Sequence, residues 1–200
     1  KVNDNIRTCE MLGGKIKSVA VANFNKQENI KSQGPSYGRN QLIKMMWNST
    51  DFFAILDADD MWHPDKISKS IASVLTCTDK IGAVYSDNLS LNIHNNNIIR
   101  EYRESFNFKR LLQHNMVHSG CVINKLALSQ VGLYDEEMRV AEDYDLWIRI
   151  AEKMLIYHIP EPLVTIRVGS HNTGNSIAPE IWQQNWQRIA QKIQMRQQIA

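Results

Sequence analysis

The stretch ILDADDMWHPDK, residues 55–66, decides the fold because it joins an apolar run to a helix start through a cluster of aspartates. The run FFAIL (residues 52–56) is typical of a strand that is covered on both faces, and Pro64 suits the first turn of a helix. In an open α/β sheet, ligands bind outside the carboxyl ends of the strands. Asp57, Asp59 and Asp60 fall at that end, so the stretch predicts a ligand site there.

Strand and helix patterns alternate along the rest of the chain. We expect strands at 18–22, 52–56, 81–85, 121–123, 155–159 and 163–166, and helices at 40–47, from 64 onward, 108–113, 143–154 and from 179 to the end. Strands separated by helices predict an α/β class, with an open, mostly parallel, Rossmann-like sheet flanked by helices. We assign residues 1–178 to one domain and residues 179–200 to a helix that packs on it or extends from it.

The composition describes a globular domain without a broad electrostatic field. Hydrophobic residues make up 43% of the 200, charged residues 22%, and the formal net charge is +2, so no nucleic-acid partner is expected. Three cysteines without CxxC spacing predict reduced thiols and a cytoplasmic location. No apolar run approaches the ~20 residues of a membrane span. The opening KVNDNIRTCEMLGG lacks Met and begins in mid-pattern, which predicts a fragment or a processed product.

Three crowded carboxylates repel one another unless a cation joins them. Hard oxygen ligands favour Mg²⁺ or Mn²⁺, and such an ion keeps only one or two protein carboxylates while substrate phosphates supply further ligands. The aspartate cluster therefore predicts a metal site for a diphosphate. The alternative is that an aspartate caps the helix that begins at Pro64. One residue would be enough for capping, so we favour the metal.

A second acidic concentration, YDEEMRVAEDYDLWIRI, covers residues 134–150. Glu142 and Asp143 lie at the start of a predicted helix, where the helix dipole favours their ionised forms, and Asp145 points elsewhere on that helix. Taken alone, the segment is ordinary helix N-terminal sequence. Beside a metal–phosphate site, however, an ionised carboxylate on a rigid helix is a candidate general base.

Together, the two segments resemble the inverting family-two glycosyltransferases of the GT-A fold, which use nucleotide-sugar donors. YGRN (residues 37–40) resembles the family's Gly/Ala-Arg-Asn element, DAD (57–59) its DXD motif, and VGLYDEEM (131–138) its approach to the ED motif. RVGSHNTGNS (167–176) resembles an Arg-x-His-like C-terminal element. The joint order of these motifs is more specific than any one of them.

The resemblance implies a donor site on a GT-A-like sheet. Asp59 would be a ligand of Mn²⁺ or Mg²⁺, and Asp57 would hold the ribose or share the metal. Arg39 would lie near the nucleotide. His171 would touch the metal or the diphosphate, with an ordinary surface histidine as the alternative.

The acceptor side is implied in the same way. Asp143 would be the base, and Glu142 beside it would place the acceptor. Trp62 and His63 follow the metal motif and are expected to line the acceptor side, although a tryptophan after a strand is as often part of the core.

The function implied is metal-dependent, inverting transfer of a sugar from a UDP- or GDP-linked donor to a saccharide or lipid-linked acceptor, as in polysaccharide biosynthesis. The family normally opens with a strand, a helix and a second strand ending in DDGS, which bind the base. These are not in this sequence, so we expect an N-terminally incomplete domain. Two alternatives stay open: a degenerate, non-catalytic binding or scaffold module, and a phosphoryl or nucleotidyl transferase that uses the same carboxylates.

The C-terminal segment IWQQNWQRIAQKIQMRQQIA (181–200) carries an apolar stripe beside a basic line. The stripe consists of Trp182, Trp186, Ile189 and Ile193, and the line of Arg188, Lys192 and Arg196. This pattern permits a helix that lies on the surface of an anionic membrane. A membrane surface is then an alternative partner, and a peripheral membrane location an alternative to a purely cytoplasmic one. We expect instead that the stripe packs on the protein.

Overall fold

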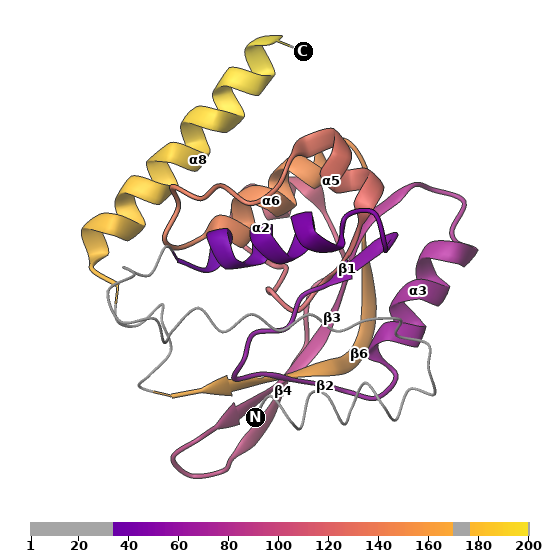
Figure 1. The fold of residues 1–200 in the computed structure, drawn as a ribbon. Helices are drawn as coiled ribbons and strands as arrows, with labels where there is room; N and C mark the ends of the chain where they lie inside the picture. Colours follow the sequence, from indigo (N-terminus) through magenta and orange to yellow (C-terminus); the bar gives the residue numbers. More distant parts are fainter. Residues whose placement is uncertain (1–33, 170–176, 200) are drawn as a thin grey trace.

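The computed structural model describes residues 34–169 and 177–199, which form a curled sheet flanked by helices (Figure 1). The strands are β1 (Phe52–Ala54), β2 (Met61–Trp62), β3 (Ile81–Asn92), β4 (Ile98–Glu101), β5 (Val122–Asn124) and β6 (Leu155–Val168). The helices are α2 (Pro35–Met46), α3 (Lys66–Thr76), α4 (Phe108–Leu111), α5 (Lys125–Val131), α6 (Glu142–Ala151) and α8 (Pro179–Ile199). The expected α/β class is confirmed. The strand expected at 18–22 lies outside the described residues.

The sheet is mixed, with the strand order β1-β5-β3-β6-β2 and with β4 paired to β3. The long strands β3 and β6 run parallel, whereas β1/β5, β3/β5, β2/β6 and β3/β4 are antiparallel pairs. Mostly parallel pairing is therefore not found among the described strands. The reason is that short strands, which need no helical crossover, fill the remaining places in the sheet.

The two long strands extend further than their apolar runs. Ser86 pairs with Ile159 but Asp87 pairs with Pro162, so the register shifts and residues 160–161 lie outside the ladder. A proline cannot donate to a ladder, and a bulge is where a strand tolerates it. The two strands expected at 155–159 and 163–166 are therefore one strand.

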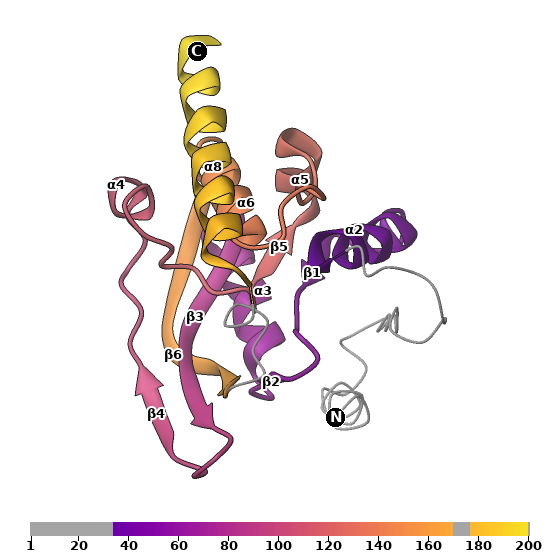
Figure 2. The same ribbon diagram turned by 90° about the vertical axis from the view of Figure 1, so that its left-hand side faces the viewer.

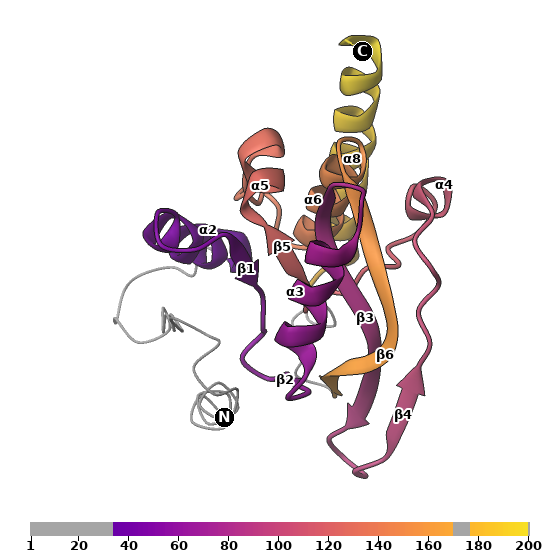
Figure 3. The ribbon, with the colours of Figure 1, turned by 90° about the vertical axis from the view of Figure 1, so that its right-hand side faces the viewer.

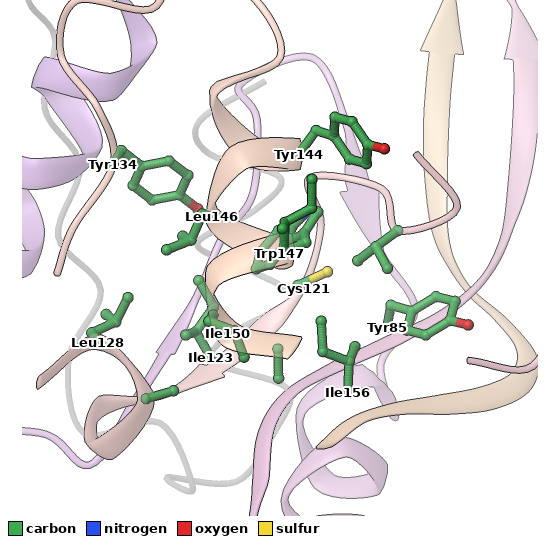
Figure 4. Packing of buried hydrophobic residues seen from close by; sticks show 14 of the residues in the cluster. Tyr85, Cys121, Ile123, Leu128, Tyr134, Tyr144, Leu146, Trp147, Ile150 and Ile156 are labelled. Carbon is green, nitrogen blue, oxygen red and sulfur yellow. The ribbon is translucent and has the colours of Figure 1, made fainter. Parts of the chain in front are cut away.

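Apolar clusters lie on both faces of the sheet. Helix α3 packs on one face, where Val74 and Cys77 contact a cluster that includes Val84 and Leu163. The larger cluster lies on the other face under α5 and α6, and Figure 1 shows α3 to one side of β3 and β6 and α6 to the other, while Figures 2 and 3 show the same elements from the two sides. Trp147 of α6 is fully buried in the larger cluster (Figure 4). Helix α6 is thereby packed against the sheet through its middle.

Helix α8 packs on the protein through both its apolar stripe and its basic line. Ile189 is buried, and the ring of Trp186 meets Tyr144 of α6 edge-on at 5.2 Å between centroids. The basic side chains form ion pairs: Arg188 and Lys192 with Asp135, Lys192 with Asp145, and Arg196 with Glu152. The expected packing of the stripe is thus observed, and ion pairs within the chain occupy the basic line. Over residues 34–169 and 177–199, none of the helices has the length and apolar character required to cross a membrane.

The ion pairs of Lys192 predict a measurable loss of stability on substitution. Lys192 Nζ lies 2.9 Å from Asp135 Oδ2 and 2.8 Å from Asp145 Oδ1, and the Asp145 side chain is only 1% exposed. Because Arg188 and Arg149 still hold these carboxylates, we expect Lys192→Met to lower the free energy of unfolding by about 1–2 kcal/mol. Gln191→Met, at the exposed neighbouring position, should change it by less than about 0.5 kcal/mol. Equal midpoints of urea unfolding for the two variants would show that the ion pairs of Lys192 do not stabilise the fold.

Candidate active site

Arg39 on α2 lies between the two acidic segments of the sequence. Its Nη2 donates to Asp57 Oδ1 at 2.7 Å, and its Nη1 donates to Glu142 Oε1 at 2.6 Å. The Arg39 side chain is 14% exposed and that of Glu142 is 10% exposed. Burial alone would lower the pKa of Arg39, but the charges of Asp57 and Glu142 outweigh it and raise that pKa. One guanidinium therefore joins the DAD segment to the ED segment.

Asn40, the neighbour of Arg39, holds the loop that carries Tyr134. Its Nδ2 donates to the carbonyl of Tyr134 at 2.9 Å, and its Oδ1 accepts from the amide of Tyr134 at 3.0 Å. The guanidinium of Arg39 lies over the Tyr134 ring, 5.3 Å from the centroid. The Arg-Asn pair thus has two tasks, because Arg39 contacts the carboxylates while Asn40 fixes the loop beneath it.

Both oxygens of Asp57 are engaged. Oδ1 accepts from Arg39, and Oδ2 accepts from the hydroxyl of Ser119 at 2.9 Å. Burial would raise the pKa of Asp57, but the charge and hydrogen bond of Arg39, with the hydrogen bond of Ser119, hold that pKa below its ordinary value. Asp57 is therefore a fixed, ionised carboxylate at the end of the segment that follows β1.

Asp59 and Asp60 differ from Asp57 and from each other. Asp59 is exposed, whereas Asp60 is buried and accepts the amide of Arg167 at 3.1 Å. Burial, partly opposed by that hydrogen bond and reinforced by the charges of Asp57 and Asp59, raises the pKa of Asp60 to about 7. None of the three caps α3, because its N-cap is Asp65 and the helix begins at Lys66. The capping alternative is therefore wrong.

The aspartates supply part of the ligand set of a divalent cation, but not all of it. Within the part of the chain that the structure describes, no three His, Cys, Asp or Glu side chains are grouped to hold a metal ion. A substrate-bound Mg²⁺ or Mn²⁺ needs only one or two protein carboxylates, however, and Asp59 is exposed to receive it. Burial is the main cause of the raised pKa of Asp60, and the charges of Asp57 and Asp59 add a smaller repulsion, which a cation would relieve. His171, the other expected ligand, lies outside the described residues.

Glu142 and Asp143 begin α6 directly after Ala141, whose φ of 58° is left-handed. Glu142 is tied to Arg39, while Asp143 is half-buried beside it. Burial, followed by the charge of Glu142, raises the pKa of Asp143 to about 7; the charge of Arg39 and the amide of Tyr144 oppose this only in part. A carboxylate with a pKa near neutrality is suited to general base catalysis.

Asp145 lies away from this site, as the sequence predicts. It is 1% exposed and is paired with Arg149 and Lys192. Arg149 also donates to the carbonyls of Val131 and Leu133, so this pair fixes the loop that leads to Tyr134. Asp145 is therefore a structural carboxylate.

The structure places Trp62 and His63 on and after β2, where Trp62 pairs with Val164 of β6. The indole Nε1 of Trp62 is buried and has no hydrogen-bond partner among the described residues. His63 is exposed, and its Nδ1 accepts the amide of Asp65 at 3.2 Å. Among the residues that the structure describes, no hydrogen bond or ion pair joins either side chain to Arg39, Asp57 or Glu142, so their acceptor role stays a prediction.

Two side chains near the site were missed by sequence reasoning. Ser119 reaches Asp57 from a loop that His118 fixes: His118 Nε2 donates to the carbonyl of Ser86, and its Nδ1 accepts the amide of Gly120, both at 3.0 Å. Tyr134 is 4% exposed and points toward Leu146 in Figure 4, with a hydroxyl that lacks a partner among the described residues. Tyr134 lies in the quoted VGLYDEEM motif, but no local pattern indicates Ser119.

Comparison with known proteins gives glycosyltransferases as relatives. Residues 10–175 match the model of the family described as glycosyltransferase like family 2. An uncharacterized glycosyltransferase of Rickettsia typhi is 24% identical over 160 residues, covering 74% of this chain and 50% of its own. One of Methanocaldococcus jannaschii is 28% identical over 149 residues, covering 66% and 50%. The chain thus spans about half the length of these curated relatives.

Solved structures of Staphylococcus aureus TarS have a similar fold. The complex of TarS with UDP-GlcNAc has a TM-score of 0.57 at 13% identity, covering 76% of this chain and 44% of TarS. The complex with UDP has a TM-score of 0.53 at 14% identity, covering 72% and 43%. Such low identity supports the GT-A fold alone, but the family model covers most of the chain. The chain belongs to glycosyltransferase like family 2.

Proposed function

We propose that this chain carries the site of a metal-dependent, inverting glycosyltransferase that moves a sugar from a UDP- or GDP-linked donor to a hydroxyl of a saccharide or lipid-linked acceptor. The observation that carries the proposal is the bridge of Arg39 between Asp57 and Glu142, at 2.7 and 2.6 Å. A donor group and an acceptor group must meet at one anomeric carbon, and this bridge brings the two acidic segments together. The nucleotide ligands of TarS, UDP and UDP-GlcNAc, support a nucleotide-sugar donor.

On the acceptor side, Asp143 takes the proton of the attacking hydroxyl. The hydroxyl oxygen forms a bond to the anomeric carbon as the bond from that carbon to the diphosphate oxygen breaks, and the electron pair leaves with the nucleoside diphosphate. Attack opposite the leaving group inverts the configuration. Because the pKa of Asp143 is about 7, the group is ionised often enough to accept a proton near neutral pH. Glu142, held by Arg39, places the acceptor beside Asp143.

On the donor side, Asp59 would hold Mn²⁺ or Mg²⁺, and Asp57 would hold the ribose or share the ion. The ion would neutralise the charge that develops on the leaving diphosphate. Asp57 is already fixed by Arg39 and Ser119, so it is suited to orient a ligand. Asp59 is exposed and therefore accessible to an incoming metal–nucleotide.

The test is calorimetric titration of UDP, GDP and their sugars into the intact protein, with and without Mn²⁺. We expect metal-dependent binding, and a thermal stabilisation of about 2.7 kcal/mol at 100 times the dissociation constant. Asp59→Ala should abolish the metal-dependent part because it removes an oxygen ligand at a charged phosphate. Asp65→Ala, at an exposed aspartate at the start of α3, is the matched control and should bind as the wild type does.

Three outcomes would contradict parts of the proposal. Normal donor binding by Asp59→Ala would overturn the metal assignment. Binding of no nucleotide by the wild type would favour a non-catalytic module. Release of pyrophosphate instead of nucleoside diphosphate would identify a nucleotidyl transferase that uses the same carboxylates.

A further inference from the structure

The turn that begins α6 is strained. Ala141 has φ 58° and ψ 21°, a left-handed conformation, and no side chain caps the helix at this position. For a residue with a Cβ, this conformation costs roughly 1–2 kcal/mol. Such a residue persists only where its surroundings hold it, and the next two residues are Glu142 and Asp143. The direction of the carboxylate pair therefore depends on what holds this turn.

Helix α8 contacts the chain on both sides of the carboxylate pair. The Nδ2 of Asn185 donates to the carbonyl of Val140 at 2.9 Å, and Asn185 is 6% exposed. The next residue, Trp186, meets the ring of Tyr144 edge-on. Val140 precedes the strained Ala141 and Tyr144 follows Asp143, so two adjacent residues of α8 bracket the pair.

The same helix also anchors the loop before the turn. Arg188 Nε and Lys192 Nζ donate to Asp135 Oδ2 at 2.8 and 2.9 Å, and they hold the pKa of Asp135, against the effect of burial, at about 2. Lys192 further binds Asp145 within α6. The segment from Asp135 to Asp145 is thus fixed at both ends by α8, and Asn185 is the contact nearest the strained residue.

We propose that Asn185 is a positioning residue, through which α8 holds the strained turn at Ala141 and so aims Glu142 and Asp143. This inference rests on the proposed function, in which Asp143 is the base. Asn185 touches no reacting atom in this scheme. Its amide fixes the Val140 carbonyl, and that carbonyl fixes the turn.

The experiment compares Asn185→Ala with Gln184→Ala in the intact protein. Gln184 is an exposed amide one residue earlier on α8, so its removal should leave kcat unchanged. Asn185→Ala should lower kcat by roughly 10- to 100-fold, the scale of a small misplacement of a reacting group, with a smaller change in the donor KM. The amide of Asp145 donates to the Ala141 carbonyl at 3.1 Å, so its hydrogen exchange should be faster in Asn185→Ala only. Equal kcat and equal exchange in the two variants would overturn the inference.

A second substitution separates positioning from a general effect on stability. Ala141→Gly removes the steric cost of the left-handed conformation, so in the Asn185→Ala background it should recover about fivefold in kcat. Because the glycine also relieves strain in the folded state, kcat is measured at a temperature where circular dichroism shows every variant to be fully folded, so that a change in kcat reports positioning and not the amount of folded protein. Absence of rescue would therefore contradict the inference. Failure of the proposed function would instead appear as an inactive wild type, and the exchange rates would still test whether Asn185 holds the turn.

Discussion

Asp143→Asn is expected to lower the transfer rate by ~10²–10⁴-fold while donor binding stays intact. The amide has nearly the shape of the carboxylate but cannot accept the proton of the acceptor hydroxyl. In the wild type, activity should rise with pH up to about 7, because the base works only when it is deprotonated and its pKa lies there. The measurements are transfer rates across pH and calorimetric titration of the donor with Mn²⁺.

The residual activity of Asp143→Asn should lose this rise with pH. Normal transfer by the variant would show that the base assignment is wrong, and Glu142 would be the next candidate. Asp145 is no longer an alternative, because Arg149 and Lys192 already hold its two oxygens at 2.9 and 2.8 Å.

Asp143→Asn is expected to raise the stability of the fold although it lowers the transfer rate. Since the pKa of Asp143 is higher in the folded protein than the ordinary carboxyl value, the folded state binds more protons between these two values. This group's contribution to stability therefore falls as the pH rises from about 4 to about 7. Asp143→Asn removes that loss, so above pH 7 the variant should be more stable than the wild type by up to about 4 kcal/mol. Melting curves at pH 5 and pH 8 measure the difference.

Arg39→Met is expected to reduce the free energy of unfolding by about 3 kcal/mol and to weaken donor binding. The substitution leaves the carboxylates of Glu142, which is 10% exposed, and Asp57, which is 36% exposed, without their shared cation. Removal of one partner from a buried ion pair costs more than the pair contributes, because it leaves an uncompensated charge. Asp57 then loses one of its two anchors, so the donor side should also lose order.

Lys44→Met on the same helix is the matched control. Lys44 is 57% exposed and lies 3.8 Å from Glu136, so its ion pair is a weak surface contact. Its loss should change the free energy of unfolding by less than about 1 kcal/mol. Urea unfolding and donor titration of both variants provide the comparison, and similar losses in the two would contradict the bridging role of Arg39.

Local patterns predicted the elements whose stability depends on their own sequence periodicity. The helices α3, α6 and α8 were expected within two residues of where they begin, because their apolar residues repeat at helical spacing. The short elements β2, β4 and α5 were not predicted. A strand of two residues, such as β2, or one that forms only by pairing with its hairpin partner, such as β4, has no period to detect. Helix α5 has 7 residues, too few for a clear stripe.

The sequence by itself determined which residue types form the candidate site and in which order: an Arg-Asn pair, the aspartate cluster and the Glu-Asp pair. Only the tertiary structure decided what each one contacts. Arg39 is 18 residues from Asp57 and 103 from Glu142, and it contacts both because α2 lies between their segments. The three aspartates look equivalent in sequence, yet one is held by Arg39, one is exposed and one is buried. Burial and charge depend on the folded arrangement, so the raised pKa of Asp143 arises only when the folded chain buries this carboxyl beside Glu142, against the opposing charge of Arg39.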